Sequence, residues 1–169
     1  MIKSFSVGTL IILCAALIES VILSNIMFLP AVPDLVLICV LFISLHNGKL
    51  VGEGSGFVSG LMLDFLSASP PGLNALYRTL LGYVGGLFTK SLNTEGFFIP
   101  MLLGLCASVS KVIMLWILSV LYPSDLLSFT PFTWTVLFEI GLNTILTPFI
   151  FKFLNLFKNT LVLRPETIV

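Results

Sequence analysis

The sequence contains very little charge: lysine, arginine, aspartate and glutamate together make up only 9% of its 169 residues. Soluble globular proteins carry roughly 25% charged residues. So small a charged fraction leaves too little polar surface to cover a globule in water, and the mean hydropathy of +1.14 agrees with this. The sequence therefore indicates an integral membrane protein whose surroundings are partly lipid.

The sequence also lacks clusters of basic residues and of metal-binding residues. Eight basic residues balance eight acidic ones, and the basic residues form no run or stripe, so binding to nucleic acid has no electrostatic basis. The three cysteines Cys14, Cys39 and Cys106 lie far apart in apolar stretches, without CxxC spacing, and their odd number argues against a disulfide framework. We expect no cofactor and no metal site.

The motifs of membrane-embedded hydrolases are missing as well. The single histidine, His46, lies at a predicted turn, and the sequence contains no GxSxG or HExxH motif. Asp34 and Asp64 are the candidates for a pair of catalytic aspartates, but neither lies in a glycine-flanked motif of the kind such proteases use. We therefore expect no enzymatic activity.

Six apolar segments alternate with short turns that contain polar residues, proline or glycine. They cover residues 4–24, 32–46, 50–67, 73–90, 97–122 and 132–153. A spanning helix needs about 20 mostly apolar residues, so the second segment is short, and a re-entrant segment is the alternative there. The predicted fold is all-α: residues 1–169 form one polytopic membrane domain, a bundle of six transmembrane helices.

The charges of the loops favour six crossings over five. With six crossings, all lysines and arginines outside the spans fall on one side: Lys3, Lys49, Lys90, Lys152, Lys158 and Arg164. Without the second crossing, Lys3 falls on the wrong side. Because lysine and arginine concentrate in cytoplasmic loops, the pattern predicts a multi-pass protein with both termini in the cytoplasm. The first segment is interpreted as a span and not a signal peptide, because Glu19 interrupts it and no small-x-small cleavage site follows.

Ionisable residues inside membrane spans are costly, and each marks a candidate functional position. Asp64 and Arg78 flank a short Pro-Gly turn at similar depth, so we expect them to form an ion pair. Lys111 and Glu139 also lie at matching depths, with Asn143 one turn below Glu139. A ligand cavity or relay is one interpretation. Internal ion pairs that fix helix packing are the interpretation we favour, because both pairs balance in sign.

Glycines recur every four residues in the third and fourth segments. The series are Gly52, Gly56 and Gly60 followed by Asp64, and Asn74 and Arg78 followed by Gly82 and Gly86. Small residues at this spacing share one helix face and let helix backbones approach closely in lipid. We therefore expect these two segments to pack tightly, with Asp64, Asn74 and Arg78 clustered near the outer surface.

Three stretches carry a family resemblance: PDLVLI at 33–38, GLMLDFLSASPPGLNAL at 60–76 and LLGYVGG at 80–86. They resemble the rod shape-determining protein MreD family. That family has a proline-aspartate opening of an apolar span, a glycine-rich span ending in Leu-x-Asp and a Ser-Pro-x-Gly-Leu-Asn turn. The matching residues here are Pro33, Asp34, Gly56, Gly60, Asp64, Ser69, Pro70, Gly72, Leu73 and Asn74.

The resemblance implies a non-enzymatic scaffold of the bacterial cell-wall elongation machinery, located in the inner membrane. Its partners would be an MreC-like membrane protein and, directly or indirectly, MreB filaments and the peptidoglycan glycosyltransferase and transpeptidase. Its architecture would be similar to that of the substrate-binding subunits of energy-coupling-factor vitamin transporters. A vitamin-binding subunit of such a transporter is the alternative function, although the short outer loops offer few converging polar groups.

Overall fold

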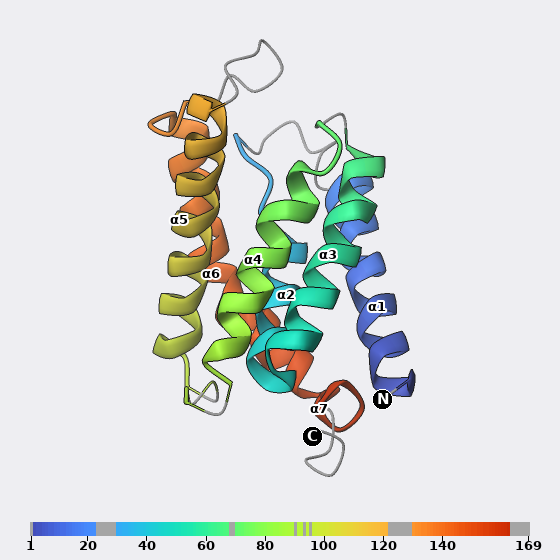
Figure 1. Ribbon diagram of the computed structural model, residues 1–169. Helices are drawn as coiled ribbons and strands as arrows, with labels where there is room; N and C mark the ends of the chain where they lie inside the picture. Colours follow the sequence, from blue (N-terminus) through green and yellow to red (C-terminus); the bar gives the residue numbers. More distant parts are fainter. Residues whose placement is uncertain are drawn as a thin grey trace.

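The structure is a computed structural model that describes residues 2–22, 30–67, 70–89, 91–92, 94, 96–121 and 130–162. In these ranges the protein consists of helices and contains no strand (Figure 1). The helices are α1 (Ile2–Leu17), continued by a π-helical turn (Ile18–Ile22), α2 (Leu35–Asn47), α3 (Lys49–Leu66), α4 (Leu73–Leu87), α5 (Phe98–Leu121), α6 (Trp134–Asn155) and the single turn α7 (Lys158–Leu161). The all-α prediction is confirmed, and a helix lies in each of the six apolar segments.

Two of the described helices, α5 and α6, are long and apolar enough to cross a membrane. The helix α2 has 13 residues, so it is about 20 Å long at 1.5 Å per residue. The hydrocarbon core of a bilayer is about 30 Å thick. Six crossings therefore stay a prediction.

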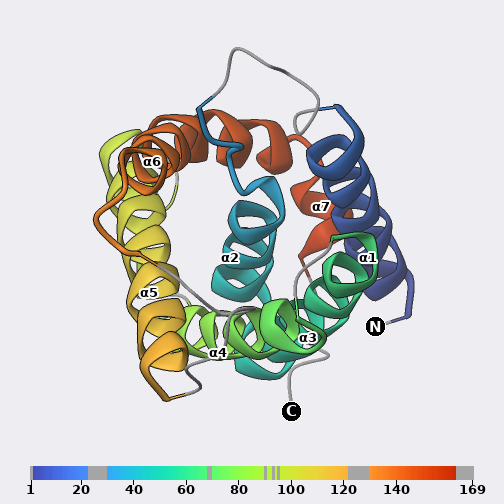
Figure 2. The ribbon, with the colours of Figure 1, turned by 90° about the horizontal axis from the view of Figure 1, so that it is seen from above.

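The short helix α2 lies at the centre of the molecule. Seen from above, α1, α3, α4, α5 and α6 surround it (Figure 2). Eleven of its residues are buried, and buried apolar side chains lie on all of its sides. A helix that is hydrophobic all round belongs either in the interior of a protein or in lipid. The sequence of α2 is thus compatible with its central position.

The helix α2 begins three residues later than the predicted segment. The side chain of Asp34 accepts a hydrogen bond of 2.8 Å from the backbone N–H of Leu37, so Asp34 is the N-cap of α2. An aspartate at this position satisfies one of the free N–H groups at the start of a helix. The residues just before it, up to Pro33, are not helical. A polar carboxylate is thereby brought inside the bundle at the end of a helix.

Helices α3 and α4 form a hairpin whose backbones touch at their glycines. A Cβ atom added to Gly56 would collide with the backbone of Arg78, and one added to Gly82 would collide with the backbone of Gly52. The same holds for Gly60 and Gly86, whose Cβ atoms would meet the backbones of Ala75 and Lys49. The third and fourth segments therefore approach closely in the structure, as expected. This contact fixes the position of Arg78 and the other polar residues of α4 relative to α3.

Candidate functional site: a buried ion network and an adjoining groove

Asp34 connects three other helices through its side chain and backbone. Its Oδ1 atom lies 2.8 Å from Nη2 of Arg78 on α4, and its Oδ2 atom lies 2.7 Å from Nζ of Lys111 on α5. Its backbone N–H donates a hydrogen bond of 2.8 Å to Oδ1 of Asn143 on α6. Asp34 and Arg78 are almost completely buried, with 2% and 1% of their surfaces exposed. Asp34 is therefore the centre of the polar interior.

Lys111 extends this network to α6, because its Nζ atom also lies 2.6 Å from Oε1 of Glu139. The expected pair of Lys111 and Glu139 is present in the structure. Two carboxylates and two cations thus balance in sign, which is the condition for burying charges in an apolar interior. Lys111 and Glu139 are 16% and 23% exposed, so this end of the network is partly accessible.

The expected ion pair between Asp64 and Arg78 is not formed, and this part of the sequence prediction is wrong. Asp64 instead accepts hydrogen bonds from the backbone N–H groups of Gly72, Asn74 and Ala75, at 2.9, 3.0 and 3.2 Å. The residue before α4 is Gly72, which has no side chain to cap the helix and has a positive φ of 89°. A carboxylate from α3 therefore supplies the acceptors that the first turn of α4 needs.

Exchanging the residues at these two positions is expected to give no rescue. In the variant D64R/R78D, the new arginine would face the N–H groups that begin α4, and the new aspartate would face Asp34. Asp64→Ala alone is expected to lower the free energy of unfolding by about 1–2 kcal/mol, as for the loss of a helix cap. Thermal unfolding in detergent measures both effects. A double variant more stable than Asp64→Ala would contradict this assignment.

Tyr77 joins the cap of α4 to the ion network and was missed by the sequence analysis. Its hydroxyl lies 3.1 Å from Oδ1 of Asn74 and 3.2 Å from Oδ2 of Asp34, and it is shared between these two acceptors. Asn74 in turn donates from Nδ2 to Asp64. The ring of Tyr77 lies 5.1 Å from the guanidinium of Arg78, within range of a cation–π contact. In the sequence, only its position one turn after Asn74 could have indicated that Tyr77 belongs to this polar cluster.

The remaining residues singled out in the sequence lie around this network or at the helix ends next to it. Asn143 does not contact Glu139 in the described hydrogen bonds; its Nδ2 atom donates to Ser108 on α5. The family-motif residues Pro33 and Asp34 precede α2. Pro70 and Gly72 lie in the turn before α4, Leu73 and Asn74 begin α4, and Ser69 lies outside the described residues. Glu19 accepts a hydrogen bond of 3.2 Å from the backbone N–H of Val36, so it supports the first turn of α2.

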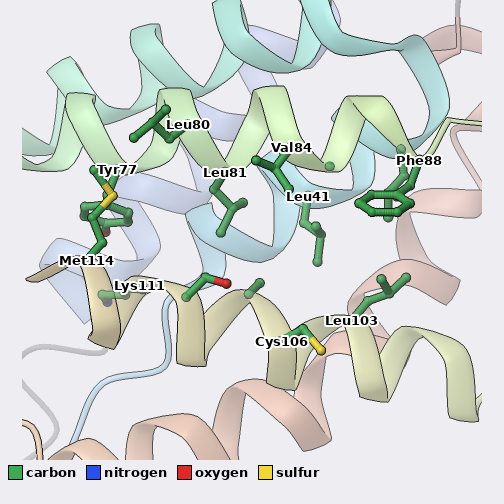
Figure 3. A pocket seen from close by; sticks show the side chains of 14 residues that line it. Leu41, Tyr77, Leu80, Leu81, Val84, Phe88, Leu103, Cys106, Lys111 and Met114 are labelled. Atoms are coloured by element: carbon green, nitrogen blue, oxygen red, sulfur yellow. The ribbon is translucent and has the colours of Figure 1, made fainter.

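A groove of about 200 Å³ runs between α4 and α5 beside the network (Figure 3). Its walls are mostly apolar, with Leu80, Leu81 and Val84 from α4 facing Leu103, Cys106 and Met114 from α5 (Figure 3). Tyr77 and Lys111 line it as well, so the ion network forms part of its wall. Among the described residues, no group of three or more histidine, cysteine, aspartate or glutamate side chains is placed to hold a metal. The arrangement suits the binding of an apolar partner.

Comparison with known families gives one match. The sequence model described as rod shape-determining protein MreD matches residues 1–157. This range contains every residue of the ion network and of the groove. A search of curated proteins and a search of solved structures found no match.

Proposed function

Because this chain belongs to the MreD family of rod shape-determining proteins, we propose that it is a non-enzymatic scaffold that binds an MreC-like membrane protein. Rod shape determination is the role of the family. The finer proposal is that the scaffold helps to couple this partner to MreB filaments and to the peptidoglycan synthases, directly or indirectly. The observation that carries it is the apolar groove between α4 and α5, whose wall is held by buried ion pairs.

The proposed setting is the bacterial inner membrane, crossed six times with both termini in the cytoplasm. Support comes from the helices in all six apolar segments and from the one-sided distribution of lysine and arginine in the loops. The central α2 would be shielded from lipid by the surrounding helices, so its shortness would carry no penalty. The likeness to vitamin transporter subunits stays a prediction.

The groove has the properties of a binding site for a partner helix. Helices in lipid associate through van der Waals packing and a few interhelical hydrogen bonds. The α4–α5 groove provides a concave apolar surface, together with Lys111 and the exposed Ser110. Lys111 uses its ammonium for two described ion pairs, to Asp34 and Glu139, and the same group lies 5.7 Å from the centroid of the Tyr77 ring. A vitamin site would need more converging polar groups than the groove offers.

Filling the groove is expected to weaken the complex with the MreC-like partner. Val84→Trp places a large ring between α4 and α5, whereas Ile145→Trp makes a matched change at an exposed aliphatic residue of α6 outside the groove. We expect Val84→Trp to lower recovery of the partner in mild detergent about tenfold, or about 1.4 kcal/mol, and Ile145→Trp to leave it unchanged. Pull-down with quantified partner measures this. Equal recovery of the partner with both variants would overturn the groove as the proposed binding site.

A further inference from the structure

A second cavity, of about 250 Å³, lies where the turn before α5 meets the end of α6. Its wall includes Thr94, Phe97, Pro148, Phe151, Lys152 and Asn155. None of these residues belongs to the ion network or to the α4–α5 groove. The cavity is therefore a separate feature of the molecule that the scaffold function does not use.

Two polar groups in this cavity have no partner in the part of the chain that the structure describes. The Oδ1 atom of Asn155 is buried and accepts no hydrogen bond. Lys152, three residues earlier on the same face of α6, forms none of the ion pairs among the described residues. A buried acceptor that is left unsatisfied costs free energy. The pair thus presents a cation and an acceptor to a ligand.

Thr94 adds a second acceptor. The Nδ1 atom of His46 lies 2.8 Å from the carbonyl oxygen of Phe42, so in the neutral ring this nitrogen carries the hydrogen. The other ring nitrogen, Nε2, then accepts from the hydroxyl of Thr94 at 3.3 Å. Among the described hydrogen bonds, none is donated to the oxygen of Thr94. The cavity therefore suits a ligand that combines an anion with hydrogen-bond donors.

Phe97, which lines the cavity, belongs to a group of aromatic side chains at this end of the bundle. Phe97 and Phe149 are in edge contact, with ring centroids 5.8 Å apart, and 57% of Phe149 is exposed. Phe153, one turn further along α6, is exposed as well. On the proposed topology this is the cytoplasmic interface, where aromatic residues gather. Basic pockets between helices at this level hold the headgroups of anionic lipids.

We propose that this cavity binds the headgroup of phosphatidylglycerol from the cytoplasmic leaflet. Its phosphate would pair with Lys152, and its glycerol hydroxyls would donate to Oδ1 of Asn155 and to Thr94. The acyl chains would lie along Phe97 and Phe149. Phosphatidylcholine has no hydrogen-bond donor for the two acceptors. Phosphatidylethanolamine has a donor, but it carries no net negative charge to balance Lys152.

Native mass spectrometry of the full chain in detergent tests this proposal without any partner protein. The chain is mixed with equal amounts of phosphatidylglycerol and phosphatidylcholine of identical acyl chains. We expect phosphatidylglycerol adducts to exceed phosphatidylcholine adducts about tenfold, or about 1.4 kcal/mol, from the hydrogen bonds that phosphatidylcholine cannot donate to the two acceptors. Lys152→Gln should lower this preference by removing the contribution of net charge, while Lys49→Gln, which removes an exposed lysine outside the cavity at the start of α3, should preserve it.

Further measurements distinguish binding of the phosphatidylglycerol headgroup from binding of free phosphate or of another lipid. Asn155→Leu should lower the preference without changing charge, because one of the two acceptors is lost. Inorganic phosphate should leave the lipid adducts in place. Equal retention of both lipids by the wild-type chain would overturn the proposal, as would an unchanged preference in Lys152→Gln or Asn155→Leu. Displacement by inorganic phosphate would assign the cavity to free phosphate, and equal binding of phosphatidylethanolamine would remove the role of the net charge. Both outcomes overturn the headgroup assignment.

Discussion

Asp34→Asn is expected to be the most destabilising polar substitution in this protein, with a loss of about 3–5 kcal/mol in the free energy of unfolding. Asp34 is the carboxylate partner of Arg78 and one of two for Lys111. Its neutralisation leaves a fully buried guanidinium without a counter-ion, and the Nε and Nη1 atoms of Arg78 already lack hydrogen-bond partners. Denaturant or thermal unfolding of the purified protein in detergent measures the loss.

A double-mutant cycle separates the ion pair from other effects of the substitution. In Asp34→Asn combined with Arg78→Gln, no unpaired guanidinium remains, and Lys111 keeps Glu139. The combined loss should be smaller than the sum of the two single losses by at least about 1 kcal/mol, since contacting residues couple by 0.5–3 kcal/mol. Additive losses would contradict the assignment of Asp34 as the partner of Arg78.

Gly56→Val is expected to disrupt the α3–α4 hairpin, at a cost of about 3 kcal/mol, the upper part of the usual range for overpacking. A Cβ atom at Gly56 would collide with the carbonyl group of Arg78, and backbone cannot move aside as a flexible side chain can. Because Arg78 belongs to the ion network, the same displacement should also strain its contact with Asp34. Thermal unfolding in detergent measures the effect.

Gly54 provides the control on the same helix. No atom lies within 4 Å of a Cβ atom added there. Gly54→Ala should therefore leave stability unchanged or raise it by up to about 1 kcal/mol through helix propensity, whereas Gly56→Ala should lower it. Similar changes for the two alanine variants would show that the glycines of α3 do not act through contact with α4.

The positions of the helices could be predicted from the sequence because apolar runs, and the polar, proline and glycine residues that separate them, are local properties. The cap by Asp34 sets the start of α2 at Leu35, three residues after the first residue of the predicted apolar segment, because hydropathy does not register a cap. The central position of α2 also lies beyond local reasoning, although its uniformly apolar surface is compatible with it.

Depth matching along the spans predicted one ion pair and failed for the other. Lys111 and Glu139 lie on adjacent helices, α5 and α6, so equal depth brought them together. For Arg78 the nearest carboxylate by depth was Asp64, but that group serves the backbone of α4. The true partner, Asp34, enters the bundle at the end of a non-helical segment. Counting residues from span ends cannot place such a residue.

The enclosure of α2 has a consequence for how the chain is assembled during synthesis. The helices α1, α3 and α4 leave one side of α2 uncovered, and α5 and α6 close that side only later (Figure 2). Until they arrive, an apolar helix lies open on one flank, and Asp34 lacks the lysine and the amide that it contacts in the finished protein. We therefore expect the insertion of α5 and α6 to complete the interior, because a nascent chain that ends before α5 has the contact of Asp34 with Arg78 but not those with Lys111 and Asn143.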